Sequence, residues 1–239
     1  MIEIIPAIDL IDGKCVRLTQ GDYNAKKVYN ENPVEVAKEF EGNGIRRLHV
    51  VDLDGAASHH VINYRTLDKI AGSTSLTIDF GGGIKSDEDL VIAFDNGAQM
   101  VTIGSVAVKD PTLFGKWLFQ YGPEKIILGA DVKDSNIAIN GWKEESTLSL
   151  EDFLNDYTQK GVYKVLCTDI SKDGTLEGPA VSLYQQIMEK YSNLHLIASG
   201  GVSSIDDIYR LEEAGIPAVV FGKALYEGRI SLKDLMPFI

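Results

Sequence analysis

The sequence of 239 residues has little that would hold it in a membrane or cross-link it. No apolar run approaches the ~18 residues that a transmembrane helix needs. Its two cysteines, Cys15 and Cys167, form neither a disulfide framework nor a metal-binding spacing, which is typical of a reducing compartment. Residues 1–6 lack the basic and small-residue features of a secretory signal. We therefore expect a cytoplasmic protein with no metal site and no contact with a membrane.

Basic residues are fewer than acidic ones. The chain has 23 lysines and arginines and 35 aspartates and glutamates, so its net charge is −12. Nucleic acids and anionic membranes are bound by positively charged surfaces, so the sequence excludes them as partners. A phosphorylated ligand would have to be held by local devices, such as backbone N–H groups and helix N-termini.

Short apolar segments alternate with helical patterns along the whole chain. The helical segments 33–44, 86–97 and 204–215 each end on a glycine. Eight strands that alternate with helices predict a parallel sheet, either a closed barrel or a doubly wound sheet. No proline- or serine-rich linker divides the chain, so we expect one domain over residues 1–239. The predicted strands are residues 3–8, 46–51, 76–78, 100–103, 125–130, 163–167, 194–198 and 218–221.

An internal repeat favours the barrel. Gly82 and Gly83 align with Gly200 and Gly201 at an offset near 118 residues. Two similar halves of four βα units close naturally into an eight-stranded ring. The sequence therefore predicts an α/β fold, a (β/α)₈ TIM barrel with a twofold repeat of (β/α)₄ halves. Further pairs at nearly the same offset are Asp89 with Asp207, Gly97 with Gly215, Gly104 with Gly222, and Asp9 with Asp131.

Glycine-rich segments follow four of the predicted strands. Such segments let a backbone approach an anion, and the helix that follows offers N–H groups. Two such sites, half a turn apart, suit a small substrate with a phosphate at each end. The alternative is that these glycines only form tight turns, and that Lys85 and Lys223 are solvated surface lysines. The candidate phosphate-binding residues are Gly82, Gly83, Lys85, Gly104 and Ser105 in the first half, and Gly200, Gly201, Gly222 and Lys223 in the second.

Asp9 and Asp131 end the first and fifth predicted strands. These strands face each other in an eight-stranded ring, and the active site of such barrels lies at the carboxyl ends of the strands. Two carboxyl groups on opposite sides of one substrate suit general acid and general base catalysis. The alternative is that each aspartate only caps the turn that follows its strand.

Four further residues are candidates with open alternatives. Thr168 could hydrogen-bond a reacting hydroxyl, whereas Asp173 could equally belong to a turn. His49 lies within an apolar strand, where a satisfied core histidine is commoner than a substrate contact. Trp142 lies in a long predicted loop after the fifth strand, and it could stack on a flat ring or anchor the loop.

The sequence contains no dinucleotide-binding fingerprint, no cysteine–histidine cluster and no conspicuous lysine at a strand end. We therefore expect chemistry that needs no cofactor, which leaves proton transfer as the natural reaction class.

Motifs from end to end resemble the phosphoribosylformimino-aminoimidazole carboxamide ribonucleotide isomerases of histidine biosynthesis. The opening and the DGTL motif are the most specific. These motifs are residues 5–10 (IPAIDL), 12–14 (DGK), 16–18 (VRL), 49–56 (HVVDLDGA), 81–84 (GGGI), 140–142 (NGW), 168–170 (TDI), 173–176 (DGTL), 199–202 (SGGV) and 222–225 (GKAL).

The resemblance implies an Amadori rearrangement of a bisphosphorylated aminoaldose to an aminoketose. It implies that Asp131, as general acid, protonates the ribose ring oxygen and that Asp9, as general base, removes the proton at C2. Thr168 matches a position that orients the sugar, and Asp173 matches one at the edge of the site. Arg17 and Trp142 match substrate contacts in mobile loops.

Two departures from the family pattern stand out. Lys85 replaces an arginine that is common in the family, so a compact ammonium group stands where other members have a planar guanidinium with paired donors. Asn140 replaces the arginine found in members that also isomerise phosphoribosylanthranilate, which argues against dual specificity.

Two rival functions are left open by the sequence. The sister cyclase-lyase barrel shares both aspartates, but it usually opens with Cys-Leu-Asp-Val where this chain has AIDL, and it works with a glutaminase. The other rival is a phosphosugar-binding barrel without catalysis. We expect the isomerase, with a small bisphosphorylated substrate and no obligatory protein partner.

Overall fold

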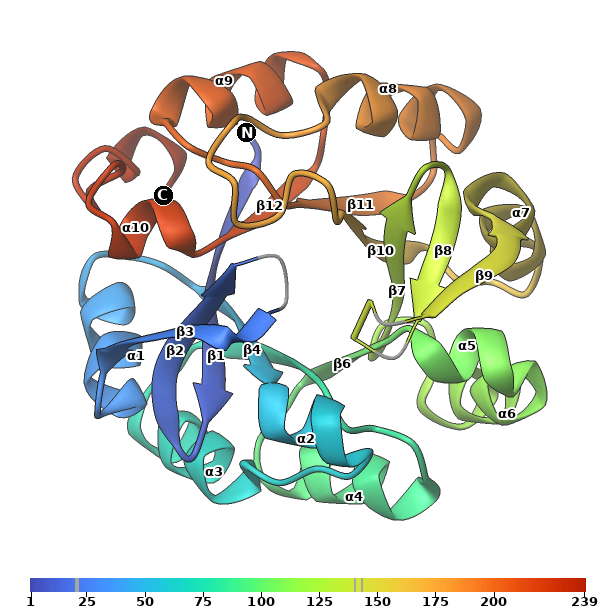
Figure 1. The fold of residues 1–239 in the computed structure, drawn as a ribbon, viewed down its shortest axis with the longest axis horizontal. Helices are drawn as coiled ribbons and strands as arrows, with labels where there is room; N and C mark the ends of the chain where they lie inside the picture. The colour runs from blue at the N-terminus through green and yellow to red at the C-terminus, as the bar shows by residue number, and fades with distance from the viewer. Residues whose placement is uncertain (20–21, 140, 143) are drawn as a thin grey trace.

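The computed structural model describes residues 1–19, 22–139, 141–142 and 144–239. In this part of the chain, eight parallel strands form a closed ring surrounded by helices (Figure 1). Strand β1 pairs with both β4 and β12, and β10 pairs with both β7 and β11, which closes the barrel. The predicted eight-stranded barrel is confirmed. Its strands, in ring order, are β1 (Glu3–Ile11), β4 (Arg47–Asp52), β5 (Thr77–Gly81), β6 (Met100–Ile103), β7 (Ile126–Lys133), β10 (Lys164–Asp169), β11 (His195–Ser199) and β12 (Ala218–Phe221).

The helices cover the outside of the ring (Figure 1). The predicted segments 33–44, 86–97 and 204–215 are helical, but each helix ends two residues before the terminal glycine. Gly44, Gly97 and Gly215 have φ values of 89°, 102° and 75°, so they reverse the chain beyond the helix. The helices are α1 (Pro33–Gly42), α2 (Leu53–Ser58), α3 (Tyr64–Ser73), α4 (Asp87–Asp95), α5 (Ser105–Lys109), α6 (Pro111–Tyr121), α7 (Leu150–Gln159), α8 (Val181–Lys190), α9 (Ile205–Glu213), α10 (Lys223–Tyr226) and the 3₁₀ turn η1 (Met236–Phe238).

Two antiparallel hairpins extend the sheet beyond the barrel. β2 (Lys14–Thr19) and β3 (Asp22–Asn30) follow β1, and β8 (Asn136–Ile139) and β9 (Glu144–Ser149) follow β7. The predicted long loop after the fifth strand is therefore wrong. Asp134 and Ser135, with φ values of 48° and 68°, turn the chain so that it pairs with the end of β7 instead of leaving the sheet.

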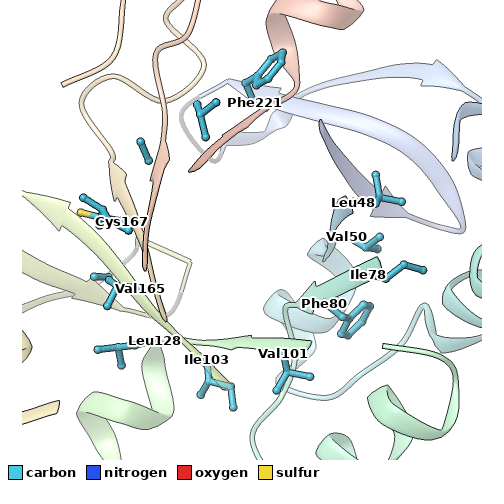
Figure 2. Close-up of a cluster of buried hydrophobic side chains, with 14 of the residues drawn as sticks. Leu48, Val50, Ile78, Phe80, Val101, Ile103, Leu128, Val165, Cys167 and Phe221 are labelled. Atoms are coloured by element: carbon cyan, nitrogen blue, oxygen red, sulfur yellow. The ribbon is translucent and has the colours of Figure 1, made fainter. Parts of the chain in front are cut away.

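The strand side chains alternate between two apolar layers, as the two-residue period of a strand requires. Outward side chains such as Leu48, Ile78 and Phe80 pack between barrel and helices (Figure 2). A smaller cluster fills the barrel itself and includes Ile5, Ala7, Met100, Ile127, Leu166 and Ile197. Because Leu48 and Phe80 face outward, the residues that alternate with them on β4 and β5 face the barrel interior. These two layers fix the strand ends in position around the barrel mouth.

Equivalent features follow opposite strands, which supports the predicted twofold repeat. One hairpin follows β1 and the other follows β7, four places apart in the ring of eight. Gly82 and Gly200 have φ values of 95° and 98°. Asp89 and Asp207 are buried and accept backbone hydrogen bonds at the starts of α4 and α9. No helix in the described ranges is long and apolar enough to cross a membrane.

Candidate active site

One cavity of about 260 Å³ opens at the carboxyl ends of the barrel strands. Every candidate site residue predicted from the sequence lines this cavity. The structure therefore brings the candidate acid–base residues and the candidate phosphate-binding residues together. These residues are Asp9, Arg17, Gly82, Gly83, Lys85, Gly104, Ser105, Asp131, Trp142, Thr168, Asp173, Gly200, Gly201, Gly222 and Lys223. Asn140 lies outside the described residues.

Asp9 is a buried carboxylate paired with an arginine. It lies near the end of β1, where it is opposite Val16 of the first hairpin. Arg17, the next residue on that strand, places Nη1 2.8 Å from Asp9 Oδ2. Burial raises the pKa of Asp9, and the guanidinium of Arg17 and the nearby His49 offset part of that rise. Asp9 is therefore a carboxylate held next to a cation at the wall of the cavity.

Arg17 also reaches the second half of the barrel. A Cβ added to Gly222 would lie 2.9 Å from Arg17 Cζ, so the guanidinium packs directly on this glycine. Within the described residues, Arg17 Nε is buried and has no hydrogen-bond partner. A buried donor without a partner costs free energy, so this group is suited to an anionic ligand. The position of Arg17 thus links the Asp9 carboxylate to the predicted phosphate segment after β12.

Asp131 has neutral hydrogen-bond partners instead of a paired cation. It lies opposite Thr168 in the register of β7 and β10. Burial raises the pKa of Asp131, and hydrogen bonds from Trp142 and Thr168, together with the nearby His49, lower it in part. Trp142 therefore contacts the candidate acid directly, in a backbone conformation with a φ of 68°. The sequence predicts stacking or loop anchoring for Trp142, and neither role includes this hydrogen bond.

His49 belongs to both the core and the cavity. Its ring is buried and bonded through Nδ1 to Asp79, as the core interpretation predicts, yet it also lines the cavity. Arg47 completes the group, with Nε 3.1 Å from Asp79 Oδ2. The sequence prediction missed Asp79 and Arg47. The available signal was Asp79 between the apolar residues Ile78 and Phe80, because a buried charge needs a partner on a neighbouring strand.

Asp173 is a third acidic group of the cavity. It belongs to the turn after β10, where its N–H donates to the carbonyl of Asp169, so the turn interpretation is confirmed. Burial and the charges of Asp9 and Asp131 raise the pKa of Asp173, whereas Arg17 and Lys223 lower it. Lys223 Nζ donates a 2.5 Å hydrogen bond to the carbonyl of Gly174 and so stabilises the same turn.

The paired glycines are required by the fold itself. A Cβ on Gly82 would lie 2.2 Å from the carbonyl oxygen of Asp52, and one on Gly201 would lie 2.3 Å from that of Gly178. The tight-turn interpretation is therefore correct for these glycines, and it does not exclude anion binding because they also line the cavity. Lys85 lines the cavity as well, where burial and the nearby Lys109 lower its pKa.

Not every aspartate at a strand end faces the substrate space. Asp52, at the end of β4, accepts hydrogen bonds from the N–H groups of Gly55, Ile62 and Asn63. It serves as an N-cap and loop anchor, in contrast to Asp9 and Asp131. In the described part of the chain, no group of three or more His, Cys, Asp or Glu side chains could hold a metal ion.

Comparison with known proteins gives matches along the full length. The family model described as histidine biosynthesis protein matches residues 3–231. A protein of Phocaeicola vulgatus is 74% identical over 239 residues, which is 100% of both chains. Proteins of Bacteroides fragilis and Bacteroides thetaiotaomicron are 73% and 71% identical over 239 residues, again 100% of both chains. All three relatives are named 1-(5-phosphoribosyl)-5-((5-phosphoribosylamino)methylideneamino)imidazole-4-carboxamide isomerase.

Proposed function

Because this chain belongs to the family of histidine biosynthesis proteins, we propose that Asp9 and Asp131 transfer the protons of the isomerisation that its relatives are named for. The chain is an aldose–ketose isomerase of histidine biosynthesis, and its substrate is the phosphoribosyl compound in the name of those relatives. The reaction is an Amadori rearrangement, in which an aminoaldose becomes an aminoketose.

One observation carries the assignment of residues. Asp9 and Asp131 line the same cavity from strands β1 and β7, which three strands separate on either side of the ring. Their partners differ, since a guanidinium contacts Asp9 and neutral donors contact Asp131. The cation favours the ionised form of Asp9, so this residue is the general base. Asp131 has no such ion pair with any residue that the structure describes, and we assign it as the general acid.

The steps follow from these roles. Asp131 gives its proton to the ribose ring oxygen, the bond from that oxygen to C1 breaks, and the electron pair of the nitrogen forms an iminium. Asp9 then removes the proton at C2, which converts the iminium to an enolamine. Proton return to C1 and loss of the hydroxyl proton at O2 give the ketone and restore both carboxyl groups. Thr168, bonded to Asp131, orients the reacting sugar.

The two ends of the substrate bind to the two halves of the barrel. In the first half the phosphate meets Gly82, Gly83 and the segment that starts α5. In the second half it meets Gly200, Gly201 and the segment that starts α10. The overall charge of −12 repels an anion, so nearby donors must provide the attraction, such as Arg17 Nε, which has no partner among the residues described.

Three further expectations belong to this proposal. The whole chain forms one domain, because the strands of a single closed sheet run from Glu3 to Phe221. It works in the cytoplasm, where buried free thiols such as Cys15 and Cys167 stay reduced. It needs no cofactor and no obligatory protein partner, because two carboxyl groups suffice for the proton transfers.

A turnover assay tests the proposal. The purified protein is incubated with the aminoaldose bisphosphate in the presence of a chelator and without nucleotide, ammonia or a second protein. We expect conversion to the aminoketose and no further product. An absolute requirement for metal or nucleotide would contradict the mechanism, and ammonia-dependent consumption of the aminoketose would indicate the cyclase-lyase instead.

A further inference from the structure

A chain of charged side chains runs through the barrel interior beneath the cavity. His49 Nδ1 bonds to Asp79, whose second oxygen is 3.1 Å from Arg47 Nε. Arg47 Nη1 then reaches Glu3 Oε2 at 2.9 Å. Asp79 has no exposed surface, whereas the Glu3 side chain is 40% exposed. The chain thus links a solvent-exposed carboxylate at one end of the barrel to an imidazole in the cavity wall at the other.

The sheet register fixes the upper part of this chain. His49 lies opposite Asp79 on the neighbouring strands β4 and β5, and both side chains face the barrel interior. His49 also lies opposite Ala7, so it stands one inward-facing step below Asp9. That step is about 7 Å along the strand. The imidazole is therefore at the floor of the cavity, beneath the space that the two candidate catalytic carboxylates share.

The hydrogen bond between His49 and Asp79 gives the two nitrogens of the imidazole ring different roles. Nδ1 is committed to Asp79, and the ring lines the cavity, so Nε2 is the nitrogen left for a ligand. A carboxylate at Nδ1 requires a proton there, which fixes the tautomer as well as the ring orientation. Without that partner, either nitrogen could hold the proton and the ring could turn over.

We propose that Asp79 is a positioning residue that keeps the Nδ1–H tautomer of His49, so that Nε2 contacts a ribose hydroxyl of the bound substrate. The inference rests on the proposed function, because it assumes a sugar between Asp9 and Asp131. Asp79 acts through His49 and does not itself reach the reacting atoms.

The electrostatics agree with this role. Burial alone would raise the pKa of Asp79, but the neighbouring His49 and the guanidinium of Arg47, with the hydrogen bonds that both donate, lower it below its ordinary value. Asp79 therefore remains a carboxylate that can accept the Nδ1 proton. Thr102 Oγ1, 3.4 Å from Asp79 Oδ1, is a further polar neighbour of this oxygen.

A purely structural role for Asp79 makes a different prediction. In that case the carboxylate only neutralises the buried Arg47, and the tautomer of His49 has no effect on turnover. Glu3 provides the matched control, because Glu3→Gln removes a negative charge from the same arginine at the end remote from the cavity. The two variants separate an effect on Arg47 from an effect on His49.

The kinetic test compares Asp79→Asn with Glu3→Gln in the full-length enzyme. We expect Asp79→Asn to lower kcat by about tenfold or more while KM changes by less than about threefold, as for a lost charged hydrogen bond that acts in the transition state. Glu3→Gln should leave both constants within about twofold. Equal losses in the two variants, or wild-type kinetics in Asp79→Asn, would overturn the proposal.

A spectroscopic test on the wild-type protein depends neither on turnover nor on the stability of a variant. The ¹⁵N shifts of the four histidines report which ring nitrogen carries the proton, with His59, His60 and His195 as internal references. In the wild type we expect a proton on Nδ1 of His49. In Asp79→Asn the amide oxygen turns to Arg47 and the amide nitrogen to His49, so the proton should move to Nε2. A neutral wild-type ring with its proton on Nε2 would overturn the proposal. Failure of the proposed function itself would be recognised separately: Asp9→Asn would then turn over substrate at the wild-type rate, whichever nitrogen of His49 carries the proton.

Discussion

The two strand-end carboxylates, Asp9 and Asp131, occupy equivalent places in opposite halves of the barrel and have different surroundings. Asp9 is paired with Arg17 at 2.8 Å, on the strand that folds back beside it. Asp131 accepts hydrogen bonds from Trp142 and Thr168, neither of which carries a charge. Burial raises the pKa of both carboxyls. The two halves therefore share a scaffold, but the partner of Asp9 is charged and the partners of Asp131 are neutral.

Under the proposed mechanism, this difference allows a barrel of two similar halves to supply both an acid and a base. A cation at hydrogen-bond distance favours the ionised form of its neighbour, whereas neutral donors permit either form. Two carboxyl groups in different surroundings can thus divide the two roles of a proton-transfer reaction. The hairpins provide the asymmetry, because Arg17 and Trp142 both lie after the end of a barrel strand, outside the eight-stranded ring.

The largest expected effect is the loss of turnover when either carboxylate becomes an amide. Asp9→Asn and Asp131→Asn should each lower kcat by about 10²- to 10⁴-fold, because general acid–base catalysis contributes on that scale. Substrate binding should change little, since neither carboxylate belongs to the proposed phosphate contacts. Steady-state kinetics and calorimetry measure the two quantities, and Asp12→Asn, at an exposed turn position, is the control.

An isotope effect distinguishes the two roles within the same pair of variants. With substrate deuterated at C2, the residual activity of Asp9→Asn should show the larger effect, because removal of the C2 proton becomes rate-limiting. The opposite order would mean that the base and acid assignments are reversed.

The second comparison concerns the glycines of the two halves. Gly82→Ala places a methyl group 2.2 Å from a backbone oxygen, whereas Gly200→Ala places it 2.9 Å from one, at similar positive φ values. We expect Gly82→Ala to lower the free energy of unfolding by about 3 kcal/mol and Gly200→Ala by less than about 2 kcal/mol.

Urea denaturation measures both changes. Gly122→Ala is the control for φ strain alone, because its φ is 83° and no atom lies within 4 Å of the added Cβ. It should cost about 1 kcal/mol. Equal losses at Gly82 and Gly122 would show that the close approach to Asp52 adds nothing.

The sequence predicts the barrel because short apolar runs alternate with helical segments, three of which end on a glycine. It predicts the cavity because the carboxyl ends of the strands of such a barrel meet at one face. Their positions at strand ends and their relation through the repeat predict that Asp9 and Asp131 share this cavity, and both line it. The same reasoning would select Asp52, which the structure shows to be a cap with three backbone donors.

The parts that could not be predicted depend on contacts between distant segments. The hairpins arise from pairing with the ends of β1 and β7, and strand pairing of this kind has a weak local signal. The contact of Arg17 with Gly222 joins residues from opposite ends of the chain. The link from Asp79 to His49 requires the register of two strands, which the sequence pattern does not specify.

The third prediction concerns the two limbs of the pH profile of kcat/KM. Arg17 lowers the pKa of Asp9, so Arg17→Gln should raise that pKa and move the acidic limb to higher pH. Trp142 lowers the pKa of Asp131, so Trp142→Phe should raise that pKa and move the basic limb to higher pH. If the roles were exchanged, each variant would move the other limb. Profiles of both variants and the wild type therefore decide between the assignments.

The smallest expected effect is on stability, and it separates the two carboxylates again. The pKa of Asp131 is raised in the folded protein, so the penalty on folding grows as the pH rises above the ordinary aspartate pKa and is complete above the raised pKa, where the carboxyl ionises in the folded state. Asp131→Asn removes the penalty and should raise the free energy of unfolding by about 1 kcal/mol at pH 7, a usual size for stabilising changes at active sites.

The same gain should shrink as the pH falls toward the ordinary aspartate pKa of about 3.9, since the wild-type carboxyl is then protonated in the folded state and increasingly in the unfolded state. Asp9→Asn should give no gain at pH 7, because Arg17 would remain buried without its partner, and an uncompensated buried charge is destabilising. Urea midpoints of both variants at pH 7 and pH 4 measure the contrast. A gain of equal size for Asp9→Asn would mean that the ion pair does not stabilise the folded state, and the base would then need another reason to be ionised.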